Sequence, residues 1–237
     1  MPASSAAGPT ARAWAWLGGA AFVASMVFCG YSYLGPFGRV TDAATLPWPV
    51  VVDVTLFSVF AIHHSVLART GAKRLVTRLI PPALERTTYV WTGSVLLALT
   101  CWWWQPVPGL IYALRGSLRP AGWILQLIGV WLTLRSAGVL DIWELSGIRQ
   151  ATGTERPPRF KVIGPYHVVR HPIYLGWVLM TFGAPDMTAT RLTFAAVSSA
   201  YLALAVPFEE RSLVETFGEE YVAYTKRVRW RMIPGIY

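Results

Sequence analysis

Six apolar segments, separated by short polar or basic stretches, constrain the fold of this 237-residue chain more than any other feature. About 20 apolar residues are enough to cross a bilayer as a helix. Hydrophobic residues make up 54% of the chain and charged residues only 14%, which excludes an ordinary soluble domain. The sequence therefore predicts an all-α, polytopic transmembrane helix bundle of about six spans. The predicted spans are 13–34, 48–67, 88–105, 120–140, 172–187 and 191–208.

The last two predicted spans differ from the others in how closely they follow each other. The run 172–187 is short, and its turn at 184–186 leads almost directly into the run 191–208. We therefore expect these two spans to form a tight helical hairpin. At the other end of the chain, residues 1–12 are small and polar with one charge and are predicted to be disordered.

The basic residues indicate the orientation of the spans. Most of the 21 Lys and Arg residues fall in the N-terminus, the loops 68–87 and 141–171, and the C-terminus. The positive-inside rule then places both termini in the cytoplasm, with a bacterial inner membrane as the expected location. The formal charge of +9 is better explained by anionic lipid than by nucleic acid, because the basic residues lie between apolar runs. We expect membrane lipid as a partner and no nucleic acid.

The C-terminal part of the chain has the pattern of an amphipathic helix. Apolar residues recur there at spacings of three and four, which gives a helix one apolar face. These residues are Leu213, Phe217, Tyr221, Tyr224 and Val228. The following basic and aromatic tail, 226–231, is interpreted as an anchor on the headgroup layer.

An Arg-His-Pro sequence lies immediately before the fifth predicted span. Pro172 disfavours helix at His171 and suits the first position of a helix, so Arg170 and His171 are expected at the helix N-terminus. Free backbone donors gather at such an end and attract anions, and an Arg side chain can bind a carboxylate there. Tyr174 adds a hydroxyl, and Gly176 allows close backbone approach.

Two adjacent carboxylates, Glu209 and Glu210, occur where the sixth predicted span returns to the same surface. They could accept hydrogen bonds from ribose hydroxyls or an ammonium group. Together with Arg170 they would make an amphoteric pocket for a zwitterionic, adenosine-bearing ligand. The alternative is structural, in which Arg170 and the Glu pair only hold two helix ends together.

Other ionisable residues fall inside the apolar runs, where they are candidates for functional sites. They are Asp53, His63, His64 and Arg135. Two neutral histidines bonded to nearby carbonyls are the favoured interpretation of 63–64, with a metal or haem role as the alternative. No metal site is predicted, because Pro172 and the lack of an acidic base argue against metal binding by His167 and His171. Cys29 and Cys101 are expected as buried thiols without a disulfide.

No glycine-rich dinucleotide fingerprint, phosphate-binding loop or nucleophile elbow is found in the sequence. The pattern Gly-Pro-Tyr, Arg-His-Pro-x-Tyr-x-Gly, an apolar span and Glu-Glu instead resembles the integral-membrane methyltransferases, including isoprenylcysteine carboxyl methyltransferase and the phospholipid N-methyltransferases. The match continues to Pro234 and covers the last third of the chain.

The front half resembles a narrower branch, the nurim-like proteins that include bacterial methanethiol S-methyltransferases. The residues that match are AIHHSVLAR (61–69), LERTTYV (84–90) and ELSGIRQ (144–150). With both halves matching, the resemblance covers most of the chain. It implies a four-span membrane region over 13–140 and a cofactor-binding region over 141–237.

What the resemblance implies is S-adenosylmethionine bound in a cytoplasm-facing pocket between the last two spans and the C-terminal helix. The implied cofactor-binding residues are Gly164, Tyr166, Arg170, His171, Tyr174, Gly176, Glu209 and Glu210. Of these, Arg170, His171 and Glu210 are the candidate catalytic residues, with Arg170 on the cofactor's carboxylate and Glu210 on its ribose or ammonium.

The expected reaction is methyl transfer to a small lipophilic thiol such as methanethiol. Alternatives are methylation of an isoprenylcysteine carboxylate or a lipid amine, and a nurim-like membrane scaffold without catalytic activity. An intact Arg-His-Pro sequence and Glu pair favours the enzyme.

Overall fold

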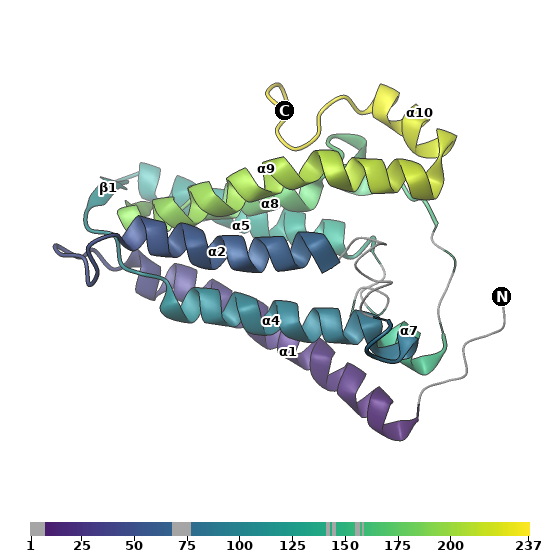
Figure 1. Cartoon of the computed structure of the whole chain (residues 1–237). Helices are drawn as coiled ribbons and strands as arrows, with labels where there is room; N and C mark the ends of the chain where they lie inside the picture. Colours follow the sequence, from purple (N-terminus) through teal and green to yellow (C-terminus); the bar gives the residue numbers. More distant parts are fainter. Residues whose placement is uncertain (1–7, 68–76, 141–142, 144–145, 155–156, 158) are drawn as a thin grey trace. The chain divides into compact units, whose positions relative to one another are not determined.

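The computed structural model describes residues 8–67, 77–140, 143, 146–154, 157 and 159–237 (Figure 1). Its contacts divide the chain into two compact units, which are described separately. The first comprises 1–37, 45–105 and 141–157, and the second comprises 38–44, 106–140 and 158–237. This division differs from the expected boundary at residue 140, because the helix before that boundary packs against the helix that follows the Arg-His-Pro sequence.

The first unit is built from three long helices, α1 (Pro9–Leu34), α2 (Pro49–Leu67) and α4 (Glu85–Trp103), with the short helices η2 (Pro82–Leu84) and α7 (Ile148–Thr152). Helix α4 packs against both α1 and α2. Small side chains on α1 permit the close approach, and the Trp91 ring lies directly over Gly18. Residues 9–12, expected to be disordered, form the first turn of α1 because Pro9 is preorganised for that position; residues 1–7 lie outside the described part.

Helix α7 caps the beginning of α4. The turn before α7 needs a glycine, since Gly147 has φ of +79° and packs against the backbone of Thr87. The Gln150 side-chain oxygen accepts a hydrogen bond from the Arg86 N–H at 2.9 Å, which satisfies one of the free donors in the first turn of α4. The segments 84–90 and 146–150 therefore fit together structurally.

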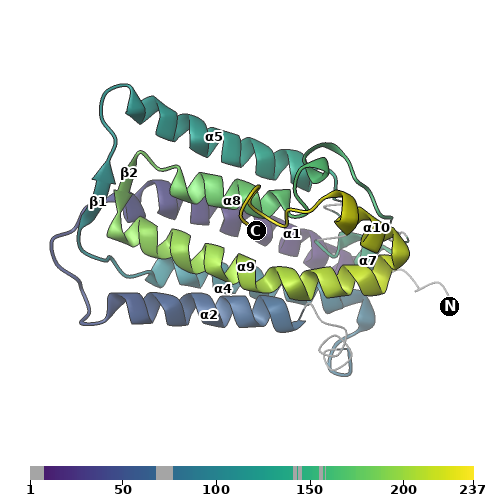
Figure 2. The same cartoon turned by 90° about the horizontal axis from the view of Figure 1, so that it is seen from above.

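The second unit contains β1 (Leu110–Ala113), α5 (Leu118–Ala137), η3 (Gly164–His167), α8 (Pro172–Phe182), β2 (Asp186–Thr188), α9 (Ala189–Phe217) and α10 (Glu219–Arg227). Helices α5 and α8 run side by side (Figure 2). They meet at Gly129 and Gly176: a methyl group on Gly176 would clash with Gly129 O and the Thr133 hydroxyl. Glycine contacts of this kind let helix backbones approach closely inside membranes.

A small antiparallel sheet, β1–β2, was not predicted for this mostly helical chain. The helix begun at Pro172 ends at Phe182 instead of continuing to 187, because Gly183 and Pro185 follow. The chain then turns, the Pro185 carbonyl accepts a hydrogen bond from the Leu114 N–H at 2.8 Å, and Asp186–Thr188 pairs with β1.

Helix α9 does not end at the Glu pair. It continues to Phe217, so Glu209 and Glu210 lie within it, and Gly218, with φ of +56°, separates it from α10. The expected single amphipathic helix after residue 210 is therefore wrong: its first half belongs to α9 and its second half to α10. The bend at Gly218 still lets Leu213, Phe217 and the two Tyr rings of α10 pack together.

Helices occupy each of the six apolar segments, and within the described residues α1, α2 and α9 are long and apolar enough to cross a membrane. Large apolar side chains project outward from these helices and from α5, including Val27 (67% exposed), Leu127 (66%) and Leu204 (71%). Soluble monomers seldom expose so much apolar surface. The surface is that of a membrane protein.

The contact between α5 and α8 predicts the effect of Gly129→Ala. The new methyl group would lie 2.5 Å from Met180 N and 2.6 Å from Gly176 O, both backbone atoms. We expect a loss of about 1–3 kcal/mol in stability, typical of overpacking, seen as a lower thermal midpoint in detergent. Gly30→Ala on α1, where nothing lies within 4 Å, is the control and should be neutral or stabilising. Equal midpoints for the two variants would contradict the prediction.

Candidate functional site

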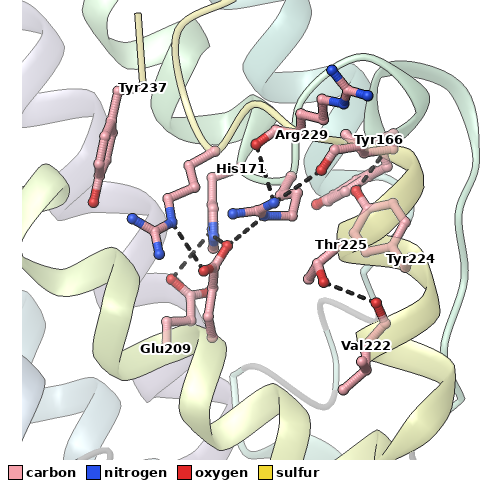
Figure 3. Close-up of polar contacts among 12 residues, drawn as sticks. Tyr166, His171, Glu209, Val222, Tyr224, Thr225, Arg229 and Tyr237 are labelled. Carbon is pink, nitrogen blue, oxygen red and sulfur yellow. Dashed lines mark hydrogen bonds and ion pairs between the residues drawn. The ribbon is translucent and has the colours of Figure 1, made fainter.

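The Arg-His-Pro sequence forms the beginning of α8, as predicted. Pro172 occupies the first helical position, and His171 precedes it with non-helical backbone angles. The short helix η3 begins at Gly164, whose φ of +58° lies in the left-handed region, and brings the chain to this point. This local geometry directs the side chains of Arg170 and His171 to the Glu pair of α9 (Figure 3).

Arg170 makes the densest set of contacts in the site. Its Nε donates to Glu210 Oε1 at 2.6 Å, and its Nη1 donates to the carbonyl oxygens of Val228 and Arg229 at 2.9 and 3.1 Å. The two charged side chains are nearly buried, with 9% of Arg170 and 12% of Glu210 exposed. Arg170 therefore links α8, α9 and the C-terminal tail.

His171 lies between the two carboxylates. Its Nδ1 is 3.6 Å from Glu209 Oε2, and its Nε2 is 3.4 Å from Glu210 Oε1. Its ring stacks on Tyr174 with centroids 5.3 Å apart. The Nε2 atom is buried and has no hydrogen-bond partner in the described part of the chain, because its 3.4 Å contact with Glu210 is poorly aligned. A buried imidazole nitrogen without a good partner is a candidate for binding a ligand.

The two carboxylates of α9 have different surroundings. Glu209 accepts a hydrogen bond from the Tyr174 hydroxyl at 2.6 Å, and 44% of its side chain is exposed. Glu210 is shielded, and both of its oxygens receive an arginine, Arg170 on Oε1 and Arg231 on Oε2 at 3.1 Å. Of the two, Glu209 is the carboxylate that a ligand can reach.

The C-terminal tail is part of the site, which the sequence did not reveal. The backbone N–H groups of Arg170 and His171 donate to the carbonyls of Trp230 and Arg231 at 2.9 and 2.8 Å. The interpretation of 226–231 as a surface anchor is thus incomplete, because these two backbone hydrogen bonds hold the tail against the Arg-His-Pro turn. Carbonyl acceptors leave no signal in a sequence, so only the basic residue Arg231 could have pointed to this contact.

An aromatic cluster supports the site from α10. Phe160 packs against Phe217, Tyr221 and Tyr224. The Tyr224 hydroxyl donates to the Tyr166 carbonyl at 2.7 Å, which fixes η3 against α10. Burial raises the pKa of Tyr166 to about 12 and raises the pKa values of Tyr221 and Tyr224 further, so all three hydroxyls stay neutral at physiological pH.

Of the remaining predicted site residues, Tyr166 and Gly164 lie in η3 and Gly176 lies in α8. Tyr166 lies in η3 and touches the cluster through its carbonyl. Gly164 lies against Arg135, since a methyl group there would be 3.7 Å from Arg135 Nη2. Gly176 faces α5, where it allows helix packing. A direct contact of these three with a cofactor stays a prediction.

The ionisable residues of α2 lie in the first unit and pair with α4. Thr92 Oγ1 is 2.8 Å from His63 Nε2, and the Tyr89 hydroxyl is 2.7 Å from His64 Nδ1. Asp53 is fully buried and accepts a hydrogen bond from the Gln105 N–H at 2.7 Å. Among the described residues, no three His, Cys, Asp or Glu side chains gather where they could hold a metal ion. The free thiols Cys29 and Cys101 are buried, as predicted.

The two tyrosines of α10 offer a matched test of the cluster. Tyr224→Phe removes the donor to the Tyr166 carbonyl and should cost about 1 kcal/mol of stability, measured by thermal unfolding in detergent. Tyr221→Phe should be neutral or slightly stabilising, because the Tyr221 hydroxyl is buried with no hydrogen-bond partner in the described residues. The reverse order of stabilities would show that η3 is not held in this way.

Comparison with known proteins gives one consistent relationship. The phospholipid methyltransferase family matches residues 118–220, which run from the start of α5 through the Arg-His-Pro sequence and the Glu pair into α10. No solved structure gives a significant match.

Three curated relatives extend the match to most of the chain. Methanethiol S-methyltransferase of Mycobacterium tuberculosis is 38% identical over 228 residues, covering 89% of this chain and 92% of the relative. Methanethiol S-methyltransferase 2 of Bradyrhizobium diazoefficiens is 40% identical, over 76% of this chain and 71% of its own length. Nurim of Xenopus laevis is 30% identical, over 65% and 58%. The resemblance inferred from the sequence is thereby confirmed, and the chain belongs to the methanethiol S-methyltransferase family of membrane proteins.

Proposed function

We propose that the protein is a membrane-embedded, S-adenosylmethionine-dependent methyltransferase that acts on a small lipophilic thiol. The observation that supports this most is the convergence of Arg170, His171, Tyr174 and the two carboxylates of α9 in one cluster. The two bacterial relatives described above are named methanethiol S-methyltransferases, and their acceptor is the first candidate here.

The polar groups of the cluster fit S-adenosylmethionine. The half-exposed Glu209 can accept from an ammonium group or from ribose hydroxyls, and the buried His171 Nε2 has unused hydrogen-bonding capacity within the described residues. When bound, the cofactor would supply a methyl group on a positively charged sulfur: a nucleophile bonds to the methyl carbon in line with the carbon–sulfur bond, which breaks and releases S-adenosylhomocysteine. Such a displacement needs alignment and a dry pocket more than covalent help from the protein.

The contacts support a change in the roles first expected for two charged residues. Arg170 already donates to Glu210 and to two carbonyls, so we propose that it organises the site and does not bind the cofactor's carboxylate. Glu210 holds two arginines, and we assign the ribose or ammonium contact to Glu209. In this proposal Glu209, and not Glu210, contacts the ribose or the ammonium group of the cofactor.

A thiol reacts as its thiolate, so the site must accept a proton. We propose that His171 accepts it. The imidazolium formed would lie within 3.6 Å of Glu209 and 3.4 Å of Glu210, which stabilise its charge. The Tyr174 ring stacks on the imidazole and restricts its rotation.

We also propose six spans, with α8 and α9 as a hairpin and both termini in the cytoplasm of a bacterium. Support comes from the helices found in all six apolar segments and from the basic residues concentrated in alternate loops. Helix α8, with 11 residues, is only about 16 Å long and would need the adjoining residues to complete a crossing.

Cofactor binding tests the proposal and separates the two carboxylates. Wild-type protein in detergent should bind S-adenosylmethionine saturably in calorimetry. Glu209→Gln should retain the thermal midpoint and weaken binding at least about tenfold, as expected for a lost hydrogen bond to a charged group. Glu210→Gln should instead lower stability by about 3–5 kcal/mol, because it leaves Arg170 nearly buried without its counter-charge.

Two results would count against this assignment. A folded Glu210→Gln protein with weak binding, together with a Glu209→Gln protein that binds normally, would reverse the two roles. Absence of binding by well-folded wild-type protein would exclude the methyltransferase proposal and favour a nurim-like scaffold.

The acceptor can be identified by its dependence on pH. With a small thiol, the initial rate at low thiol concentration should be lower at pH 6 than at pH 9, because forming the thiolate requires a base that can accept its proton. With an isoprenylcysteine carboxylate the rate should be flat from pH 6 upward. Transfer of a labelled methyl group to thiols, lipid amines and prenylcysteines over pH 6–9 distinguishes these acceptors.

A further inference from the structure

The last residues of the chain form what we call the C-terminal strap, Val228–Tyr237. Its middle is bound by backbone hydrogen bonds to the Arg-His-Pro turn, and the side chains of Val228 and Met232 are buried. Its end folds back on itself, since the N–H groups of Met232 and Ile233 donate to the Tyr237 carbonyl at 2.8 and 2.9 Å. The Tyr237 hydroxyl then donates to the Ala203 carbonyl of α9 at 3.2 Å.

Arg231 is the side chain that joins the strap to the carboxylates. Its Nε donates to Glu210 Oε2 at 3.1 Å, on the oxygen that Arg170 does not use. Its guanidinium also lies over the Tyr237 ring, 5.3 Å from the centroid. The residue lies beyond the region that matches the phospholipid methyltransferase family, which ends at 220.

The two arginines fix Glu210 from both sides. A carboxylate held on one oxygen can rotate about its side-chain bonds, whereas one held on both oxygens by groups from different elements has a single orientation. Arg170 comes from the turn before α8, and Arg231 comes from the strap. Glu210 in turn faces His171, whose Nε2 lies 3.4 Å from the oxygen bonded to Arg170, and the backbone N–H of His171 is held by the Arg231 carbonyl at 2.8 Å.

We propose that Arg231 is a positioning residue of the methyl-transfer site: it orients Glu210 and fastens the C-terminal strap over the Arg-His-Pro turn, so that Arg170 is held in place and His171 is preorganised to bind the cofactor. This inference rests on the proposed function of the site. It assigns the strap to the cofactor-binding machinery, in addition to any contact that its exposed Trp230 makes with lipid.

The test compares Arg231→Gln, Arg231→Lys and a control, Lys226→Gln. The control removes the same charge from an exposed position of α10, a few residues before the strap. Arg231→Gln should raise the dissociation constant and the KM for S-adenosylmethionine about tenfold, the effect of one lost charge-assisted hydrogen bond, with a smaller change in kcat. Arg231→Lys should recover part of the affinity, and Lys226→Gln should bind like the wild type.

Hydrogen exchange gives a readout that does not depend on the cofactor. The amides of Arg170 and His171 donate to strap carbonyls, so peptides spanning 166–175 should exchange faster in Arg231→Gln than in the wild type, while peptides of α5 and α9 should not. Normal binding and exchange in Arg231→Gln would overturn the inference while leaving the proposed function intact. Absence of cofactor binding in the wild type would overturn both.

Discussion

The ion pair between Arg170 and Glu210 is the interaction on which the rest of the site depends. Both side chains are nearly buried, and a buried charge is tolerated only when its partners are well placed. The pair meets this requirement by adding carbonyl oxygens of the C-terminal tail to the arginine and a second arginine to the glutamate. As a result, three segments distant in the sequence, 170–171, 209–210 and 228–231, are held by one network.

A second constraint is the close packing of α5 and α8. Because Gly129 and Gly176 meet backbone to backbone, α8 has little freedom to slide or rotate against its neighbour. Helix α8 is short and begins at the site, so its fixed position also fixes the direction in which His171 and Tyr174 leave the backbone. Gly176, which the sequence suggested for close backbone approach, makes such an approach to α5.

The sequence predicted the local features of the site well and the long-range ones poorly. Pro172 defines where α8 begins, and the apolar runs locate the helices, because both depend on neighbouring residues. The strap was missed because its acceptors are backbone carbonyls, which every residue has. The motifs at 84–90 and 144–150 supported the family assignment. In the structure their described residues have a structural role, since Gln150 caps α4 and Gly147 packs against the start of that helix. The sheet β1–β2 joins segments more than 70 residues apart, beyond the reach of any local pattern.

The length of α9 has a consequence for where the reaction would occur. Its 29 residues give a helix about 43 Å long, whereas the hydrocarbon layer is about 30 Å thick. Counted from Ala189, about 30 Å of helix is used up at Phe208, and the next two residues are the carboxylates. In the six-span arrangement proposed above, the length of α9 would set Glu209 and Glu210 at the boundary of lipid and water. At that depth an apolar methyl acceptor could reach the site from the bilayer and the charged methyl donor could reach it from water. The acceptor would not have to cross the aqueous phase, and the donor would not have to enter the hydrocarbon layer.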